Sequence, residues 1–146
     1  MATSSALDTL IELATRDTDE AAKRLGRAMK AAEEAEQKLV LLSQYRDDYM
    51  VRCQQSLQTG LSAAAYANFQ QFIGKLEQAV IGQQSAIRDA RLIVERERRA
   101  WQECERKRMS YGTLAERAAK VQQARENKRD QKQMDEYAAR RLSRKQ

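Results

Sequence analysis

The sequence predicts an all-α fold, namely an antiparallel two-helix coiled-coil hairpin with a C-terminal helical overhang. Its 146 residues include no proline and five glycines, 33% of them are charged and 5% are aromatic. Residues of high helix propensity, such as Ala, Glu, Lys, Arg, Gln and Leu, dominate the composition. The chain is too polar for an ordinary globular core, so we expect long helices in a single coiled-coil domain over residues 1–146.

A first helix is predicted over about residues 5–57. Ser5 and Asp8 have the spacing of a capping box, which is typical of a helix start. Alternating steps of four and three residues along this segment reach fourteen positions, of which twelve are apolar. This 3.5-residue repeat predicts the seam of a left-handed coiled coil. The positions are Leu7, Ile11, Ala14, Thr18, Ala21, Leu25, Ala28, Ala32, Ala35, Leu39, Leu42, Arg46, Tyr49 and Cys53.

A turn is predicted at about residues 58–62, in the segment QTGLS. Gly60 tolerates the left-handed backbone of a tight turn, and the Ser62 hydroxyl can cap a following helix. If the chain folds back here, residue i of the first helix faces roughly residue 123 minus i of the second. Leu7 would then lie near residue 116.

A second helix is predicted over about residues 63–142, and its apolar seam stops before its end. The same stepping gives fifteen positions up to residue 118, of which twelve are apolar, but only Ala139 is apolar among the next six. The stripe therefore ends where the first helix runs out, and we expect the second helix to be unpaired from about residue 119. Its seam positions are Phe69, Ile73, Leu76, Val80, Gln83, Ile87, Ala90, Val94, Glu97, Trp101, Cys104, Arg108, Tyr111, Ala115 and Ala118.

The sequence lacks the residues on which most enzymes and metal sites depend. It has no His, no GxxxxGK phosphate loop and no cysteine cluster of metal-site spacing. We therefore expect no catalytic residues, no metal and no cofactor. Cys53 and Cys104 are expected to be free thiols, because the hairpin separates them. The absence of a basic leader and of an apolar run of about 18 residues favours a cytoplasmic protein.

Most of the net charge of +6 belongs to residues 119–146, which hold nine Lys or Arg and four Asp or Glu, a balance of +5. Such a basic helix has an alternative interpretation, as an adaptor that binds nucleic acid or another acidic surface. The interspersed acids and the antiparallel stem argue against a DNA-reading basic region. A small apolar patch of Met134, Tyr137, Ala138 and Leu142 fits a protein groove better than a membrane surface.

Apolar residues near the predicted turn exceed what one seam needs. Two interpretations stay open for Tyr45 and Phe72: they thicken the core beside the seam, or they belong to an exposed partner surface, since such patches are rare on soluble monomers. The polar seam residues Gln83, Glu97 and Arg108 are interpreted as setting the register.

Three blocks of the chain resemble a known family: YRDDY at 45–49, NFQQFIGKLE at 68–77 and NKRDQKQMDEYA at 127–138. They are similar to the flagellar export protein FliJ family, and the likeness spans essentially the whole chain. The resemblance implies an antiparallel two-helix coiled coil, similar in shape to the central stalk subunit of rotary ATP synthases. It implies a non-enzymatic, soluble component of the flagellar type III export apparatus, in the cytoplasm and peripheral to the inner membrane at the flagellar base.

The resemblance also implies partners and sites. The terminal end would enter the central hole of the hexameric export ATPase FliI, which acts with its regulator FliH, and would promote its assembly and activity. Other implied partners are the export gate protein FlhA and the flagellar export chaperones, with no nucleic acid. The expected gate-binding residues are Leu42, Tyr45, Tyr49, Phe72, Leu76 and Ala79. The expected ATPase-binding residues of the overhang are Arg125, Lys128, Arg129, Met134 and Tyr137.

Overall fold

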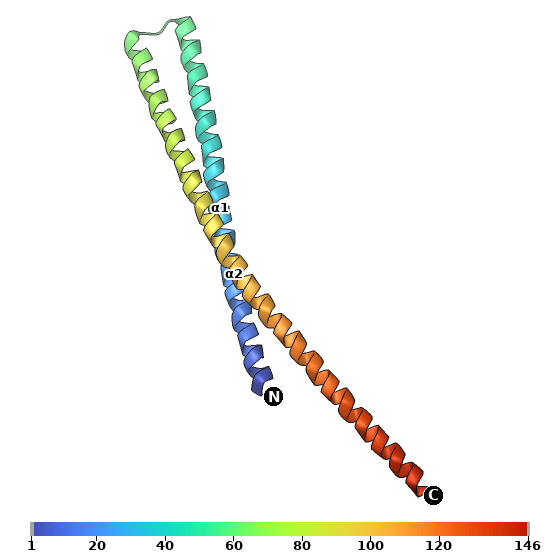
Figure 1. Ribbon diagram of the computed structural model, residues 1–146. Coiled ribbons are helices and arrows are strands. Elements are labelled where there is room, and N and C mark those ends of the chain that lie inside the picture. Colours follow the sequence, from blue (N-terminus) through green and yellow to red (C-terminus); the bar gives the residue numbers. More distant parts are fainter. Residues whose placement is uncertain (1, 146) are drawn as a thin grey trace. The chain divides into compact units, whose positions relative to one another are not determined.

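The protein consists of two long helices, α1 (Ala2–Thr59) and α2 (Ala63–Arg144), joined by residues 60–62 (Figure 1). The computed structural model describes the backbone of residues 2–145 and the side chains of residues 5–145. No strand occurs among these residues, so the predicted all-α fold is confirmed. Two compact units are distinguished: a hairpin unit, residues 20–101, and a terminal unit, residues 1–19 and 102–146.

The turn of the hairpin unit has the chemistry that its sequence predicts. Gly60 has a φ of +98°, in the left-handed region that favours glycine. The Ser62 hydroxyl accepts a hydrogen bond from the backbone N–H of Ala65 at 3.1 Å, so Ser62 is the N-cap of α2. The first backbone bond of that helix runs from the N–H of Tyr66 to the Ser62 carbonyl oxygen at 2.9 Å.

The start of α1 differs from the expectation. The helix already includes Ala2, and Ser5 lies inside it rather than capping it. The Thr9 hydroxyl donates a hydrogen bond to the Ser5 carbonyl oxygen at 3.0 Å, a contact between successive helical turns. Because no proline or glycine precedes Ser5, nothing in the sequence prevents the helix from beginning earlier.

The core of the hairpin unit is the predicted seam. Every buried residue of this unit occupies a seam position. The buried side chains of α1 are small, and those of α2 are larger and aliphatic. In the register given above, Ala28 lies opposite the partly buried Val94 and Ala21 opposite the partly buried Trp101, so large side chains of α2 face alanines of α1 there. Each buried aliphatic side chain of α2 contributes about 1.5–3 kcal/mol through removal from water. The buried residues are Ala21, Ala28, Ala32 and Cys53 of α1 and Ile73, Leu76, Val80 and Ile87 of α2.

Polar contacts between the helices fix the register of the hairpin unit. The Gln83 side-chain amide donates a hydrogen bond to the Ala35 carbonyl oxygen at 2.8 Å. Arg24 forms an ion pair with Glu97 at 3.5 Å, close to residue 99, the predicted opposite of Arg24. These contacts support the interpretation of Gln83 and Glu97 as register-setting residues, since an apolar repeat alone permits slippage by a heptad.

In the terminal unit the seam continues and then stops. Ala14 and Thr18 are buried, and the Thr18 hydroxyl donates to the Ala14 carbonyl oxygen at 2.8 Å. On α2 the last partly buried residue is Ala115, and every residue from 116 to 145 is exposed. Ala118 was expected in the seam, but it is exposed. The residue opposite it in the predicted register is Ser5, a polar residue that is itself exposed.

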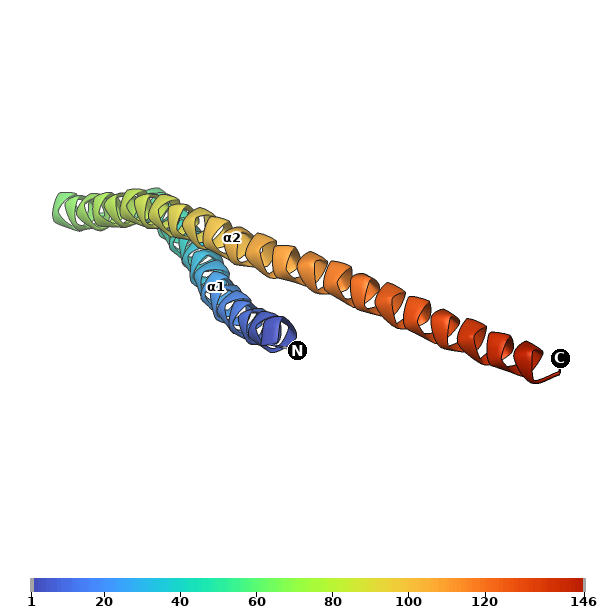
Figure 2. The ribbon, with the colours of Figure 1, turned by 60° about the horizontal axis from the view of Figure 1, so that its bottom comes forward.

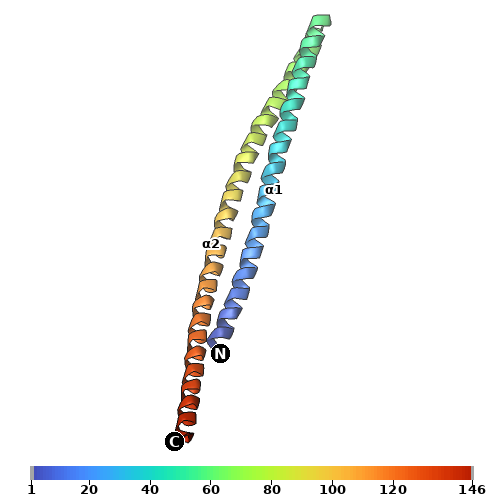
Figure 3. The same cartoon turned by 90° about the vertical axis from the view of Figure 1, so that its right-hand side faces the viewer.

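The C-terminal part of α2 therefore continues as a single helix up to Arg144. In Figure 2 and Figure 3 the red end of α2 extends past the N-terminus of α1 with no other segment beside it. This exposed segment, residues 116–145, is called the overhang below.

Two glycines of the hairpin unit are expected to respond oppositely to alanine. A Cβ at Gly82, inside α2, would meet no atom within 4 Å, so Gly82→Ala should raise the free energy of unfolding by about 0.5–1 kcal/mol through helix propensity. Gly60→Ala serves as the matched control and should lower it by about 1 kcal/mol, because φ of +98° strains an L side chain. Urea unfolding followed by circular dichroism measures both. Equal effects of the two changes would contradict the described turn.

Candidate functional site

An aromatic cluster lies near the turn of the hairpin unit and joins α1 to α2. It consists of Tyr45, Tyr49, Phe69 and Phe72. The ring of Tyr49 is its centre, with centroids 4.5 Å from Phe72, 5.2 Å from Phe69 and 6.4 Å from Tyr45. Tyr45 also meets Phe72 edge to face at 6.2 Å. Pairs of this geometry are attractive beyond their buried area, so the four rings stabilise one another.

The cluster is buried on one side and accessible on the other. Tyr45 is 53% exposed, whereas Tyr49, Phe69 and Phe72 are half-buried. Of the two residues left open, Phe72 is half-buried and thickens the core beside the seam, whereas Tyr45 is exposed. The role of Tyr45 in a partner surface stays a prediction. Phe69 was assigned to the seam only. Its spacing of three residues from Phe72 was the sequence signal that both rings share a helix face.

The remaining predicted gate-binding residues differ in their accessibility. Leu42 is half-buried and Ala79 is exposed, beside the aromatic cluster in the heptad pattern of each helix. Leu76 is only 8% exposed, because it occupies the seam itself. Leu76 therefore offers little surface to another molecule.

All five predicted ATPase-binding residues are exposed on the overhang, but they lie on two faces. Met134 is 72% exposed and Tyr137 is 66% exposed. Each follows a basic residue, Arg125 and Lys128 respectively, by nine positions. Nine positions are about two and a half helical turns, which places the basic and the apolar residues on opposite sides of the helix. A partner that touches both sets must contact the helix from two sides.

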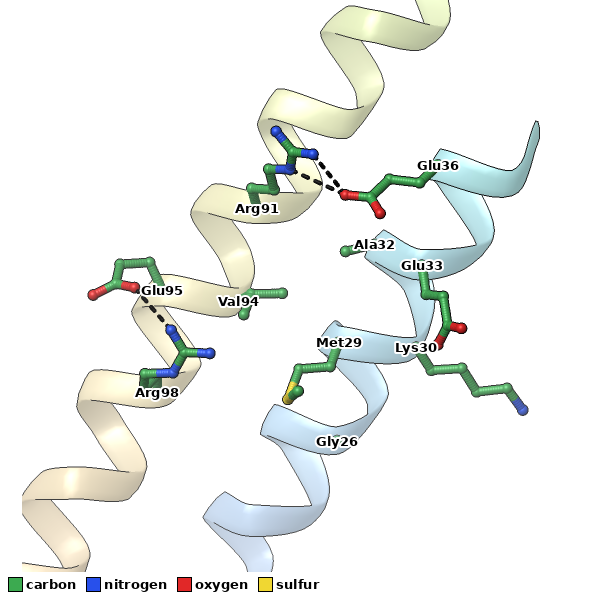
Figure 4. Close-up of a pocket in the computed structure, with 10 residues that line it drawn as sticks. All are labelled: Gly26, Met29, Lys30, Ala32, Glu33, Glu36, Arg91, Val94, Glu95 and Arg98. Carbon is green, nitrogen blue, oxygen red and sulfur yellow. Dashed lines mark hydrogen bonds and ion pairs between the residues drawn. The ribbon is translucent and has the colours of Figure 1, made fainter. Parts of the chain in front are cut away.

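A shallow groove runs between the helices of the hairpin unit (Figure 4), and four of its six charged residues form ion pairs with one another. The Arg91 guanidinium binds the Glu36 carboxylate across the groove at 2.7 Å, and Arg98 pairs with Glu95 along α2 at 3.5 Å. Met29 lies at its apolar part. The groove holds no nucleophile with an adjacent base, so its chemistry is that of a packing surface.

The polar seam residue Arg108 is accommodated in the terminal unit by an acid on its own helix. The hydrogen bond from Arg108 lowers the pKa of Glu105, and the same bond raises the pKa of Arg108. Both groups therefore stay charged at neutral pH, and the ion pair is partly exposed at the edge of the seam. This contact lies within one helix, so unlike Gln83 it does not set the register between the two helices.

Within the described residues, no group of three or more His, Cys, Asp or Glu side chains is arranged to hold a metal ion. Cys53 and Cys104 are free, as expected. Neither described helix contains a stretch long and apolar enough to cross a membrane.

Comparison with known proteins agrees with the architecture. Residues 3–146 match the family described as flagellar FliJ protein. The chain belongs to the FliJ family. Flagellar FliJ proteins of Salmonella typhi and of Escherichia coli strain K12 are each 32% identical to it over 145 residues, which cover 99% of both chains compared. The predicted resemblance is thus confirmed, and it places the chain in flagellum biogenesis and flagellar protein export.

The FliJ match includes both the aromatic cluster and the overhang, because it runs through residues 3–146. Both surfaces are therefore parts of the family domain.

Two tyrosines of the aromatic cluster should separate folding from binding. Tyr49→Ala is expected to lower the free energy of unfolding by about 2–3 kcal/mol, because three ring contacts are lost in a half-buried position. Tyr45 lies on the exposed edge of the aromatic cluster, so Tyr45→Ala should lower the free energy of unfolding by less than about 1 kcal/mol. Urea unfolding gives both values. A larger loss for Tyr45 than for Tyr49 would contradict the arrangement of the rings.

Proposed function

We propose that this FliJ family member is a non-enzymatic stalk of the flagellar type III export apparatus. Its overhang inserts into the central hole of the hexameric export ATPase FliI and promotes the assembly and activity of that enzyme. The observation that carries the proposal is the run of exposed residues from 116 to 145, in a helix that continues to Arg144.

An unpaired helix of this length suits a channel for an energetic reason. Exposed helices without tertiary packing are only marginally stable in water. Local pairs, such as the Gln123 amide donating to Asn127 at 3.1 Å, supply modest support. A partner that surrounds the overhang would supply the remaining stability and would restrict its motion.

The two faces of the overhang support insertion over binding to a flat surface. Arg125 lies opposite Met134, and Lys128 lies opposite Tyr137, so a single flat wall cannot contact all of these residues. Arg129 lies between the two sides, eight positions before Tyr137. A ring can present an acidic wall to the basic side and an apolar recess to the other. Charge complementarity would guide entry, and the apolar contacts would slow exit.

The aromatic cluster is proposed as the second docking surface, for the export gate protein FlhA. Tyr45 and Ala79 are exposed at its edge, with Leu42, Tyr49 and Phe72 behind them and Leu76 in the seam. Through these contacts the protein would link the ATPase and its regulator FliH to the gate. It would also handle export chaperones, as a cytoplasmic protein held at the inner membrane by its partners.

Removal of the overhang should abolish its effect on the ATPase. Full-length protein is expected to increase ATP turnover by purified FliI, and deletion of residues 120–146 should eliminate the increase. The triple change Arg125→Ala/Lys128→Ala/Arg129→Ala should raise the protein concentration needed for half-maximal stimulation by about tenfold, because three complementary charges are lost.

The matched control, Arg140→Ala/Arg144→Ala/Lys145→Ala, removes equal charge from the end of the same helix. The concentration at which it gives half-maximal stimulation should be close to that of the wild type. Unchanged turnover with full-length protein would contradict the stalk. Duplex DNA binding that weakens about 10³-fold or more between about 50 and 200 mM salt would instead support the nucleic-acid alternative.

Loss of the exposed ring should weaken gate binding without unfolding the hairpin unit. Tyr45→Ala is expected to reduce affinity for the cytoplasmic part of FlhA by about tenfold or more, as expected for an aromatic anchor. Ile81→Ala is the control, since Ile81 is 55% exposed on the same helix hairpin but outside the aromatic cluster. Isothermal titration calorimetry measures the affinity of each variant for FlhA. Equal affinities for wild type and Tyr45→Ala would rule out this surface.

A further inference from the structure

A second shallow groove lies between α1 and α2 in the terminal unit. Asp17 of α1 and Ser110 of α2 line it. Leu13 lies four positions before Asp17, and Leu114 lies four positions after Ser110. Residues four positions apart share a helix face, so both leucines lie on the side of the two helices on which this groove opens.

Four aliphatic side chains are exposed on this side. Leu10 precedes Leu13 by three positions and Val121 follows Leu114 by seven, the spacings at which an amphipathic helix aligns its apolar residues. None of the four belongs to the seam, so the pairing of α1 with α2 does not account for them. The exposed fractions are 41% for Leu10, 48% for Leu13, 49% for Leu114 and 52% for Val121.

Unpaired cations lie on both sides of Val121. Arg117 and Arg125 are four positions before and after it, and both are exposed. No Asp or Glu lies three or four positions from either arginine, and neither forms an ion pair among the side chains that the structure describes. Glu116 and Glu126 are their sequence neighbours, but adjacent residues diverge by about 100° around a helix, so these acids face other directions.

Among the residues that line the groove itself, the charges cancel. Arg106 pairs with Glu103 at 3.0 Å, and Asp17 and Lys107 carry opposite charges. The positive excess of this side therefore lies in the part next to Val121. The surface is called the terminal face below, and it consists of Leu10, Leu13, Leu114, Arg117, Val121 and Arg125.

We propose that the terminal face binds an acidic amphipathic helix of another protein. The occupant would pack against both α1 and α2 as the third helix of a bundle, with its apolar stripe on the three leucines and Val121. Its Asp or Glu residues would pair with Arg117 and Arg125. A third helix in the groove between two packed helices buries apolar side chains of both, as in the cores of helix bundles.

Composition favours this occupant over a membrane surface or nucleic acid. Residues 5–19 and 102–128 contain no Trp and no Phe, the anchors that are typical of interfacial membrane helices. Four aliphatic side chains gain nothing from a phosphate backbone, and two arginines neutralise few phosphates. Residues 110–125 span about 22 Å of helix, which matches about four turns of a partner helix.

The inference goes beyond the proposed function. The three leucines of the terminal face are not among the predicted gate-binding or ATPase-binding residues, and only Arg125 is shared with the ATPase-binding set. Variants at the leucines therefore test the terminal face separately from the stalk.

A synthetic helix tests the inference directly. The probe is an acidic peptide of about 18 residues, rich in Ala and Glu, whose leucines are alternately three and four positions apart on one face. A second peptide of equal composition has its leucines five positions apart, which distributes them around the helix. Fluorescence anisotropy with full-length protein should show binding of the first peptide and at least about tenfold weaker binding of the second, because only the first forms an apolar stripe.

Variants of the protein locate the contact. Leu13→Ala/Leu114→Ala should weaken binding of the first peptide by about tenfold or more, because it removes apolar contacts from both helices. Ile81→Ala/Leu92→Ala is the matched control, since both residues are exposed aliphatic side chains of the hairpin unit, and it should bind the peptide as wild type does.

The cations are tested by a separate change. Arg117→Ala/Arg125→Ala should weaken binding of the first peptide by about fivefold or more and reduce its dependence on salt, because two complementary charges are lost. Circular dichroism verifies that each variant stays folded.

Several outcomes would overturn the inference. They are equal affinity for the two peptides, unchanged affinity of Leu13→Ala/Leu114→Ala, tighter binding of duplex DNA or anionic vesicles through the same residues, or a Leu114-dependent dimer in sedimentation. Stimulation of FliI by Leu13→Ala/Leu114→Ala should equal that of wild type. Absent stimulation by the wild type would therefore contradict the stalk alone, and absent peptide binding would contradict the terminal face alone.

Discussion

The unequal seam between α1 and α2 is the constraint on which the rest of the structure depends. Alanines of α1, such as Ala28, lie opposite larger seam residues of α2, such as Val94, whereas Ile73, Val80 and Ile87 of α2 are buried nearer the turn. Small side chains offer few distinct pockets, so packing alone specifies the alignment weakly. The Gln83 hydrogen bond to the Ala35 carbonyl and the ion pair of Arg24 with Glu97 supply the missing specificity, at positions where an apolar residue would pack equally well.

Everything proposed for function follows from where this seam stops and what lies beside it. Beyond Ala115 the second helix continues with residues of high helix propensity but without a covered face. Next to the turn, aromatic side chains extend the seam outward and leave Tyr45 accessible. The overhang and the aromatic cluster differ in chemistry, and we propose that they bind different partners.

The apolar repeat was sufficient to predict the seam, because burial in a coiled coil depends on periodicity within each helix. The turn was predictable for a similar reason, since Gly60 and Ser62 act through local backbone geometry. Other features depend on the opposite helix. Ala118 matches the repeat, but no described side chain of α1 buries it. Leu76 was predicted as a binding residue, but it is buried in the seam. Ser5 could cap a helix or lie inside one, and its side-chain chemistry alone does not decide between them.

Hydrogen exchange of the intact protein, with and without the hexameric ATPase, tests most directly whether α2 extends alone to engage another molecule. In the free protein, backbone amides of residues 119–145 should exchange much faster than those of residues 73–94, because no tertiary packing protects the overhang. Adding the ATPase should slow exchange in residues 119–145. Protection of the free overhang equal to that of the hairpin, or an ATPase effect confined to the hairpin unit, would contradict the account.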